Sequence, residues 1–234
     1  MFLKIIVSVV MLISLSQAKM FQSVDVKDAT LLEKGVSKMF CDKCGMNLPK
    51  FYKSNHALKY GDGVKQFCSM HCLVEAIETD KKGELNKNDI QVVDAVSLKF
   101  IPVSKATYVV GSKIKGTMSM VSKYAFADAK KAKEFQAKNG GDIMDFDAVF
   151  KKAQTSYKKE MKMIHKKRAK MMYNKGKKVY KMRCNHDKLN ALSANTIGEM
   201  KTKIIESGVC GKLKPMQYQV TTLYYWDVVL GHGK

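Results

Sequence analysis

The sequence predicts an α+β fold, in which two small related units of β-hairpin and helix form a metal-binding domain. A long basic helix and a small all-α C-terminal domain follow. Three observations predict this order. Across residues 39–150, short runs rich in β-branched and aromatic residues end at glycine turns. Residues 151–175 have neither glycine nor proline, and residues 176–234 alternate helix formers with short polar breaks.

Residues 1–18 have the pattern of a secretory signal peptide. Lys4 supplies a positive charge, residues 5–15 are apolar but too few to span a bilayer, and Ser16-Gln17-Ala18 resembles a small-x-small cleavage site. We therefore expect the signal peptide to be cleaved and the mature chain to be exported, most simply to a bacterial periplasm. Residues 19–38 then form a short polar lead.

The first unit is expected within residues 39–79. A cysteine pair opens it, and the turn at Gly61-Asp62-Gly63 joins two short strands, the second over residues 64–67. Ser69 is placed to cap a helix over residues 71–78, because a serine hydroxyl accepts a hydrogen bond from the first free amides of a helix.

The second unit repeats this plan. Strands are predicted over residues 91–95 and 106–111, followed by a loop with two methionines at 116–120. A helix over 127–138 ends before a double glycine, and 143–146 returns as a strand. Both units place a sulfur-bearing loop ahead of a helix, which indicates that they are related and that residues 39–150 form one metal-binding domain.

From residue 147 the pattern is helical. We expect a long, exposed linker helix over residues 151–175 that ends near Asn174. Residues 176–234 then predict two or three short helices and a final aromatic-rich helix over residues 216–230.

Charge is concentrated in the helical part of the chain. The net charge is +21, and residues 151–183 hold fourteen lysines and arginines opposed only by Glu160. An exported protein rarely meets nucleic acid, so we expect no nucleic-acid partner. A solvated helix, an acidic protein partner or peripheral contact with an anionic membrane explains the charge better.

Two cysteine pairs carry the chemistry of the first unit. Gly45 permits the tight turn that lets both sulfurs of a Cys-x-x-Cys pair face one point. Cys68 and Cys72 are four residues apart and so share one helix face, with His71 near that face. Sulfur ligands select Cu(I), Zn(II) or iron–sulfur clusters over hard ions. The candidate metal ligands are Cys41, Cys44, Met46, Cys68, His71, Cys72 and Met118, and His56 is a further candidate.

Three functional classes fit these residues. Met46 and Met118 favour Cu(I), because thioethers bind Cu(I) well and zinc poorly. A closed zinc site with four cysteines in an interaction module is the first alternative. A thiol–disulfide oxidoreductase using Cys41 and Cys44 is the second, although a thioredoxin-like strand–helix context is missing. No catalytic triad or paired carboxylates with a supporting motif is apparent, so we expect no enzyme.

The methionines of the basic helix have a plainer explanation. Met161, Met163 and His165 offer soft ligands, but methionine is also an ordinary helix former and core filler. We therefore favour a structural role for these residues.

A series of motifs runs across residues 39–150. They are Cys41-Asp-Lys-Cys44-Gly45-Met46, Tyr108-Val-Val-Gly111-Ser112, Gly116-Thr-Met118, Ala132-Lys-Glu-Phe135 and Gly140-Gly141-x-x-x-Asp-Phe146. In content and order these motifs, which span about half of the chain, resemble the NosL family, the nitrous oxide reductase accessory proteins. Cys68 and Cys72 also resemble the TRASH arrangement of heavy-metal-binding cysteines.

The resemblance implies a periplasmic copper chaperone. It would supply Cu(I) for assembly of the copper centres of nitrous oxide reductase, with a membrane copper transporter complex as a partner. The family's Cys-Gly-Met motif falls on Cys44-Gly45-Met46, and its Gly-Pro-Met loop falls on Gly116-Thr117-Met118, where threonine replaces the usual proline. The usual lipid-anchored cysteine is missing and two cysteines are added, so a related cuproenzyme is an equally open client.

The C-terminal part has a resemblance of its own. Residues 176–186 and 215–226 look like the first and last helices of a small class I cytochrome c, but the haem-attachment pattern Cys-x-x-Cys-His is absent. We therefore expect a haem-free helical domain. Cys184 and Cys210 are expected to form a disulfide, which suits an oxidising compartment.

Overall fold

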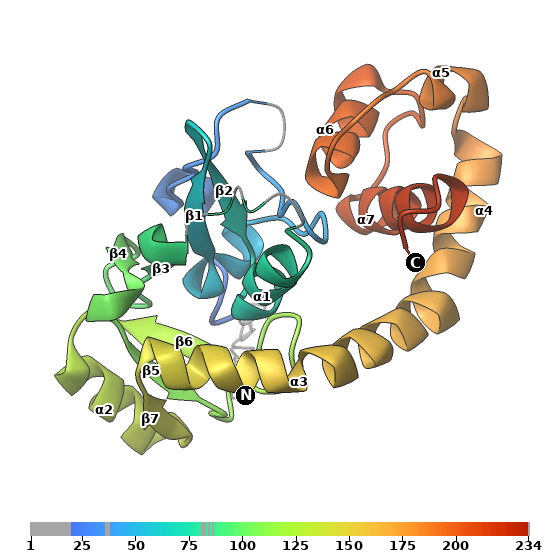
Figure 1. Ribbon diagram of the computed structural model, residues 1–234. Helices are drawn as coiled ribbons and strands as arrows, with labels where there is room; N and C mark the ends of the chain where they lie inside the picture. Colours follow the sequence, from blue (N-terminus) through green and yellow to red (C-terminus); the bar gives the residue numbers. More distant parts are fainter. Residues whose placement is uncertain (1–19, 36–37, 81–82, 84, 86, 234) are drawn as a thin grey trace, which may run out of the picture.

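A computed structural model describes residues 20–35, 38–80, 83, 85 and 87–233 of the chain. The expected signal peptide lies outside this range. Two small antiparallel sheets are followed by a long helix and a cluster of helices, which confirms the predicted α+β fold class (Figure 1). None of the described helices is long and apolar enough to cross a bilayer.

The first sheet has four antiparallel strands in the order β2-β1-β3-β4. Gly61 takes a left-handed conformation, with φ 53°, and lets β1 turn back into β2 with Tyr60 opposite Gly63. The next helix, α1, begins where predicted, because the Ser69 hydroxyl accepts from the amide of Cys72. The bounds are β1 His56–Tyr60, β2 Gly63–Phe67, α1 Met70–Glu78, β3 Gln91–Val93 and β4 Phe100–Pro102.

The prediction that the strand at residues 91–95, here β3, belongs to the second unit is wrong. Strand β3 pairs with β1 through His56 opposite Val92, and so completes the first sheet. Strand β4 was not predicted, because three residues are too few to show an alternating pattern. Short 3-10 helices flank these strands: η1 Val26–Asp28 and η2 Pro49–Ser54 precede β1, η3 Lys87–Asp89 precedes β3, and η4 Val103–Lys105 follows β4.

The second sheet has three antiparallel strands in the order β6-β5-β7, with helix α2 beside it. The strand predicted over 143–146 instead begins at Asp142 and ends at Met144, since Asp145 caps the next helix. Strand β6 was also missed. The bounds are β5 Thr107–Val110, β6 Lys123–Phe126, α2 Ala129–Asn139 and β7 Asp142–Met144.

The two sheets share one core. Leu58 and Val92 of the first sheet, Tyr108 of the second and Val149 of the long helix belong to a single buried cluster. A parallel bridge between Asp94 and Ala125 also joins the sheets directly. The two predicted units are therefore fused into one body.

Residues 24–32 of the N-terminal lead pack along this body. The amide of Val24 donates to the carbonyl of Pro49 (3.1 Å), and the amide of Leu32 donates to the side chain of Gln66 (2.9 Å). These bonds hold residues 24–32 against η2 and β2.

A nearly continuous helix leads away from the sheets (Figure 1). It consists of α3 (Phe146–Lys167), a π-helical segment η5 (Arg168–Tyr173) and α4 (Asn174–Arg183). The prediction that it ends near Asn174 is wrong. A Cβ at Gly176 would lie 2.1 Å from the Val220 carbonyl oxygen, so this glycine allows close packing of α4 against α7 and does not stop the helix.

The C-terminal helices pack around α4 and fold back toward the first sheet, with α6 and α7 nearest to it (Figure 1). Leu189, Met200, Ile204 and Tyr225 form their core. Cys184 and Cys210 are joined by a disulfide, as predicted. The bounds are α5 His186–Asn190, α6 Ile197–Ser207, α7 Pro215–Tyr224 and a π-helical end, η6, Tyr225–Val229.

Replacing Gly176 by alanine tests this packing. In an exposed helix this change stabilises the folded protein by about 1 kcal/mol. Here the added methyl group would instead clash with the backbone of α7. We expect Gly176→Ala to lower the free energy of unfolding by about 2 kcal/mol, measured by urea titration with circular dichroism. The exposed neighbour Lys177, changed to alanine, is the control. A higher midpoint for Gly176→Ala would contradict the assigned contact.

Candidate metal centre

Residues 41–46 form a tight turn, here called the cysteine knuckle. The Gly45 amide donates to the carbonyl of Cys41 (2.7 Å), and the Cys41 amide donates to the carbonyl of Met46 (2.9 Å). Gly45 has φ 65°, a left-handed conformation that favours glycine. The turn places the side chains of Cys41 and Cys44 in one buried core.

The second pair comes from the start of α1. Cys68 precedes the capping serine and Cys72 lies one turn further, with their sulfurs 3.7 Å apart. The sulfur of Cys44 lies 3.5 Å from that of Cys68. All four sulfurs lie within 4.8 Å of one another, and none of the four residues is more than 1% exposed. We call Cys41, Cys44, Cys68 and Cys72 the four-cysteine cluster.

The spacing of the cluster suits a metal ion. Four sulfurs at about 2.3 Å from a central ion stand about 3.8 Å apart in a tetrahedron, close to the 3.5 and 3.7 Å measured. All four cysteines are free rather than disulfide-bonded. The donor set is therefore that of a soft or borderline metal.

Crowding polarises the four thiols. Hydrogen bonds from the other three cysteines, and from the backbone of Met46, hold the pKa of Cys44 well below its usual value despite its burial. Burial raises the pKa of Cys68 well above its usual value, and sulfur contacts with the other three raise that of Cys72. One thiolate thus forms readily, and a bound cation would replace the remaining protons.

The two candidate methionines pack against the hydrophobic core that contains this cluster. Met46 and Met118 are half-buried and pack against the core that contains the four cysteines. Met118 has a left-handed backbone, with φ 58°. Its neighbour Thr117 lies 2.8 Å from the hydroxyl of Ser54, which in turn lies 2.8 Å from the Cys68 carbonyl. The predicted loop therefore reaches the chain beside the cluster.

His71 is not part of the four-cysteine cluster. Its Nδ1 lies 2.9 Å from Oε2 of Glu160, and its Nε2 lies 3.2 Å from the sulfur of Met161, both on α3. Burial alone would raise the pKa of Glu160, but hydrogen bonds from His71 and Ser119, with the charge of Lys123, lower it. The sequence already marked Glu160 as unusual, since it is the single acidic residue in segment 151–183, which holds fourteen basic residues.

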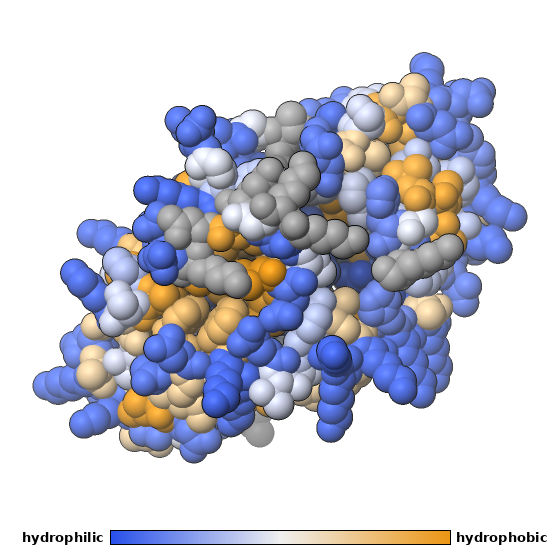
Figure 2. Space-filling view, viewed as in Figure 1, coloured by the Kyte–Doolittle hydropathy of each residue, from blue (hydrophilic) through white to orange (hydrophobic). Residues whose placement is uncertain are grey.

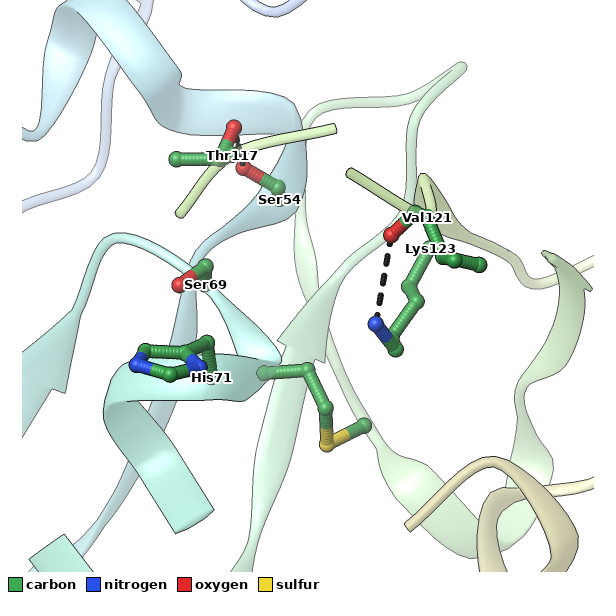
Figure 3. A pocket seen from close by; sticks show the side chains of 7 residues that line it. Ser54, Ser69, His71, Thr117, Val121 and Lys123 are labelled. Carbon is green, nitrogen blue, oxygen red and sulfur yellow. Dashed lines mark hydrogen bonds between the residues drawn. The ribbon is translucent and has the colours of Figure 1, made fainter. Parts of the chain in front are cut away.

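A cavity of about 10 Å³ lies beside His71 (Figure 3). Figure 3 shows Ser54 and Thr117 next to each other on one side, with Lys123 across the cavity from His71. The Lys123 ammonium donates to the carbonyl of Val121 (3.2 Å). The space holds about one water molecule, so it is too small for an organic ligand.

The C-terminal helices contact the cysteine knuckle directly. The Lys201 ammonium donates to the carbonyl of Gly45 (2.8 Å) and to the side chain of Gln219 (2.6 Å), and Gln219 donates to the carbonyl of Cys44 (2.9 Å). Burial lowers the pKa of Lys201 to about 8, although the nearby Cys44 thiolate opposes this shift. The sequence did not indicate either residue, because a single lysine or glutamine in a helix gives no sign of a contact with so distant a part of the chain.

Comparison with known proteins supports the assignment of residues 39–150. The model of a family described as NosL matches residues 36–154. The crystal structure of the copper chaperone NosL from Shewanella denitrificans is similar, with 24% identity over 50% of this chain and 95% of that chain, and a TM-score of 0.38. The comparison with curated proteins found no match.

His56, a further candidate ligand, has a structural environment. It is fully buried; its Nδ1 donates to the carbonyl of Ser54 (3.1 Å), and its Nε2 accepts from the hydroxyl of Tyr108 on the second sheet (3.2 Å). Burial lowers the pKa of His56 to about 4. The neutral ring thus links the two sheets.

This environment predicts a loss of stability in acid. The unfolded chain protonates His56 near pH 6.5, whereas the folded chain does so only near pH 4. Neutral His56 therefore makes its full contribution to the free energy of unfolding above pH 6.5. This contribution, about 3 kcal/mol, is lost as the pH falls from 6.5 to 4. Urea titrations over this range should show the loss in the parent and a smaller slope in His56→Gln. Equal slopes would show that His56 already carries a proton in the folded state.

Proposed function

The chain belongs to the NosL family, and on that premise we propose that it binds Cu(I) at the four-cysteine cluster and passes the ion to a cuproenzyme under assembly. The observation that carries the proposal is the convergence of four buried sulfurs within 4.8 Å, inside the part of the chain that the family model matches. Such a set of thiolates favours Cu(I) over the hard ions of the cell.

The two methionines distinguish a Cu(I) site from a zinc site. Thioethers bind Cu(I) and contribute little to zinc sites. Met46 and Met118 both pack against the hydrophobic core that contains the four cysteines, and we assign Met118, in the loop between β5 and β6, as an additional Cu(I) ligand. His71 belongs to a separate contact with α3.

A structural zinc site is the second candidate. The burial of the four sulfurs and the separations of 3.5 and 3.7 Å in two of the sulfur pairs favour it, because structural zinc sites are closed and have four cysteine or histidine ligands. The same burial argues against a thiol–disulfide oxidoreductase, since a substrate disulfide must reach an accessible thiolate.

The proposed setting is the periplasm, after cleavage of a signal peptide. The proposed client is nitrous oxide reductase or a related cuproenzyme, with a membrane copper transporter complex as the partner. The basic helix supports docking on an acidic surface, because clustered charge accelerates association. Hydrophilic side chains cover most of the face seen in Figure 2, including its lower right edge along this helix.

Metal competition under anaerobic conditions tests the proposal. Mature, reduced protein should retain Cu(I) when Zn(II) is present at the same free concentration, because the sulfur donors favour the softer ion. Chelators of known affinity for each ion would set the free concentrations, and elemental analysis would measure occupancy. Displacement of Cu(I) by Zn(II) would favour the structural zinc site instead.

The role of Met118 has its own test. Met118→Leu keeps the size of the side chain but removes the thioether, so Cu(I) affinity should fall about tenfold, or about 1.4 kcal/mol. Zinc affinity should not change, because thioethers contribute little to zinc binding. The matched control is Met120→Leu in the same loop, at a side chain that is 81% exposed. Equal Cu(I) affinities for the two variants would remove Met118 from the ligand set.

A further inference from the structure

Two soft ligand atoms face each other outside the four-cysteine cluster. The Nε2 atom of His71 on α1 lies 3.2 Å from the sulfur of Met161 on α3. The side chain of His71 is 1% exposed, and Met161 is half-buried. Met161 lies beyond residues 36–154, so the pair joins the family domain to the part of the chain that follows it.

The surroundings of His71 leave Nε2 directed at the sulfur. Oε2 of Glu160 lies 2.9 Å from Nδ1, and Oε1 of the same carboxylate accepts from the Ser119 hydroxyl (2.6 Å). A carboxylate accepts hydrogen bonds only, so the proton of a neutral imidazole resides on Nδ1. A thioether has no proton to donate, so Nε2 contacts the sulfur either as an N–H donor or, once a cation replaces that proton, as a ligand beside it. Bonds of about 2.0 Å to nitrogen and about 2.3 Å to sulfur would place a shared cation to one side of this 3.2 Å contact.

This arrangement is typical of metal-binding histidines. Such a histidine usually donates its second ring N–H to a carboxylate, which fixes the tautomer and the orientation of the ring. Tyr157 packs against the same ring, with centroids 5.5 Å apart, and limits its movement further. The imidazole is therefore held in a geometry that a metal ligand requires.

A cleft gives access to the pair. It has a volume of about 520 Å³ and lies between the first unit and the C-terminal helices, and its lining includes Tyr157, Met161, His165 and Trp226. His165 is four residues after Met161 and so lies on the same face of α3. An ion entering the cleft therefore meets Met161 before it reaches His71.

We propose that His71 and Met161 form a second site, which takes a soft monovalent cation such as Cu(I) at the contact between α1 and α3. Imidazole nitrogen with thioether sulfur favours a soft ion of low coordination number. His71 adjoins Cys72 in the chain and is buried, whereas Met161 lines the cleft, so an ion would reach this site through Met161. The proposal rests on the proposed function only for the identity of the ion.

Anaerobic Cu(I) titration of the full mature chain against a chromophoric chelator tests the second site. Met161→Leu should lose one weakly bound equivalent of Cu(I) and keep the Cu(I) that is tightly bound at the four-cysteine cluster. Met163→Leu, two residues away on the same helix at a side chain 43% exposed, should keep both. Glu160→Gln should weaken the second equivalent by about 10- to 100-fold, because an amide can donate to Nδ1 and move the imidazole proton to Nε2.

Four thiolates can bind more than one Cu(I), so the difference between Met161→Leu and Met163→Leu is decisive. Identical titrations for these two variants would overturn the second site. Ag(I), which does not change oxidation state, provides a repeat with the same expected loss, and circular dichroism verifies that each variant is folded. If Zn(II) displaces Cu(I) from the tight site while the Met161-dependent equivalent persists, the proposed function fails and the second site stands.

Discussion

The rest of the structure depends on the close approach of four sulfurs, which lie within 4.8 Å of one another and are almost completely buried. Hydrogen bonds within the cluster lower the pKa of Cys44, whereas burial and the neighbouring sulfurs raise the pKa of Cys68 and of Cys72. The knuckle and the start of α1 bring the four sulfurs together, and Met118 packs against the hydrophobic core that contains them. A bound cation would relieve the repulsion that the fold creates.

The long helix connects this chemistry to the rest of the chain. Its first half packs on α1, where Glu160 fixes the ring of His71. At the π-helical segment, Arg168 and Tyr173 both bond to Asp227 near the C-terminus, at 3.1 and 2.9 Å. The helix is therefore more than a solvated linker: Val149, Glu160 and Arg168 face the domains that it joins, whereas its lysines face solvent.

Local signals predicted much of the fold and the core of the candidate site. Gly45 indicated the knuckle, Ser69 the start of α1, and the four-residue spacing of Cys68 and Cys72 their common direction. Each depends on residues within one turn of the chain. The position of β3 in the first sheet depends instead on pairing with a distant strand, and the role of Gly176 depends on the packing of α7. Tertiary contacts determine both of these features, and local sequence patterns do not indicate such contacts.

The bonds from Lys201 and Gln219 to the carbonyls of Gly45 and Cys44 have a consequence for metal exchange. These helices belong to the same chain as the knuckle, so they compete for its backbone at an effective concentration that reaches the millimolar range for tethered groups. An acceptor protein that approaches the knuckle from this side must outcompete a built-in ligand. Selectivity for a partner then depends on how well its surface replaces an ammonium and a carboxamide.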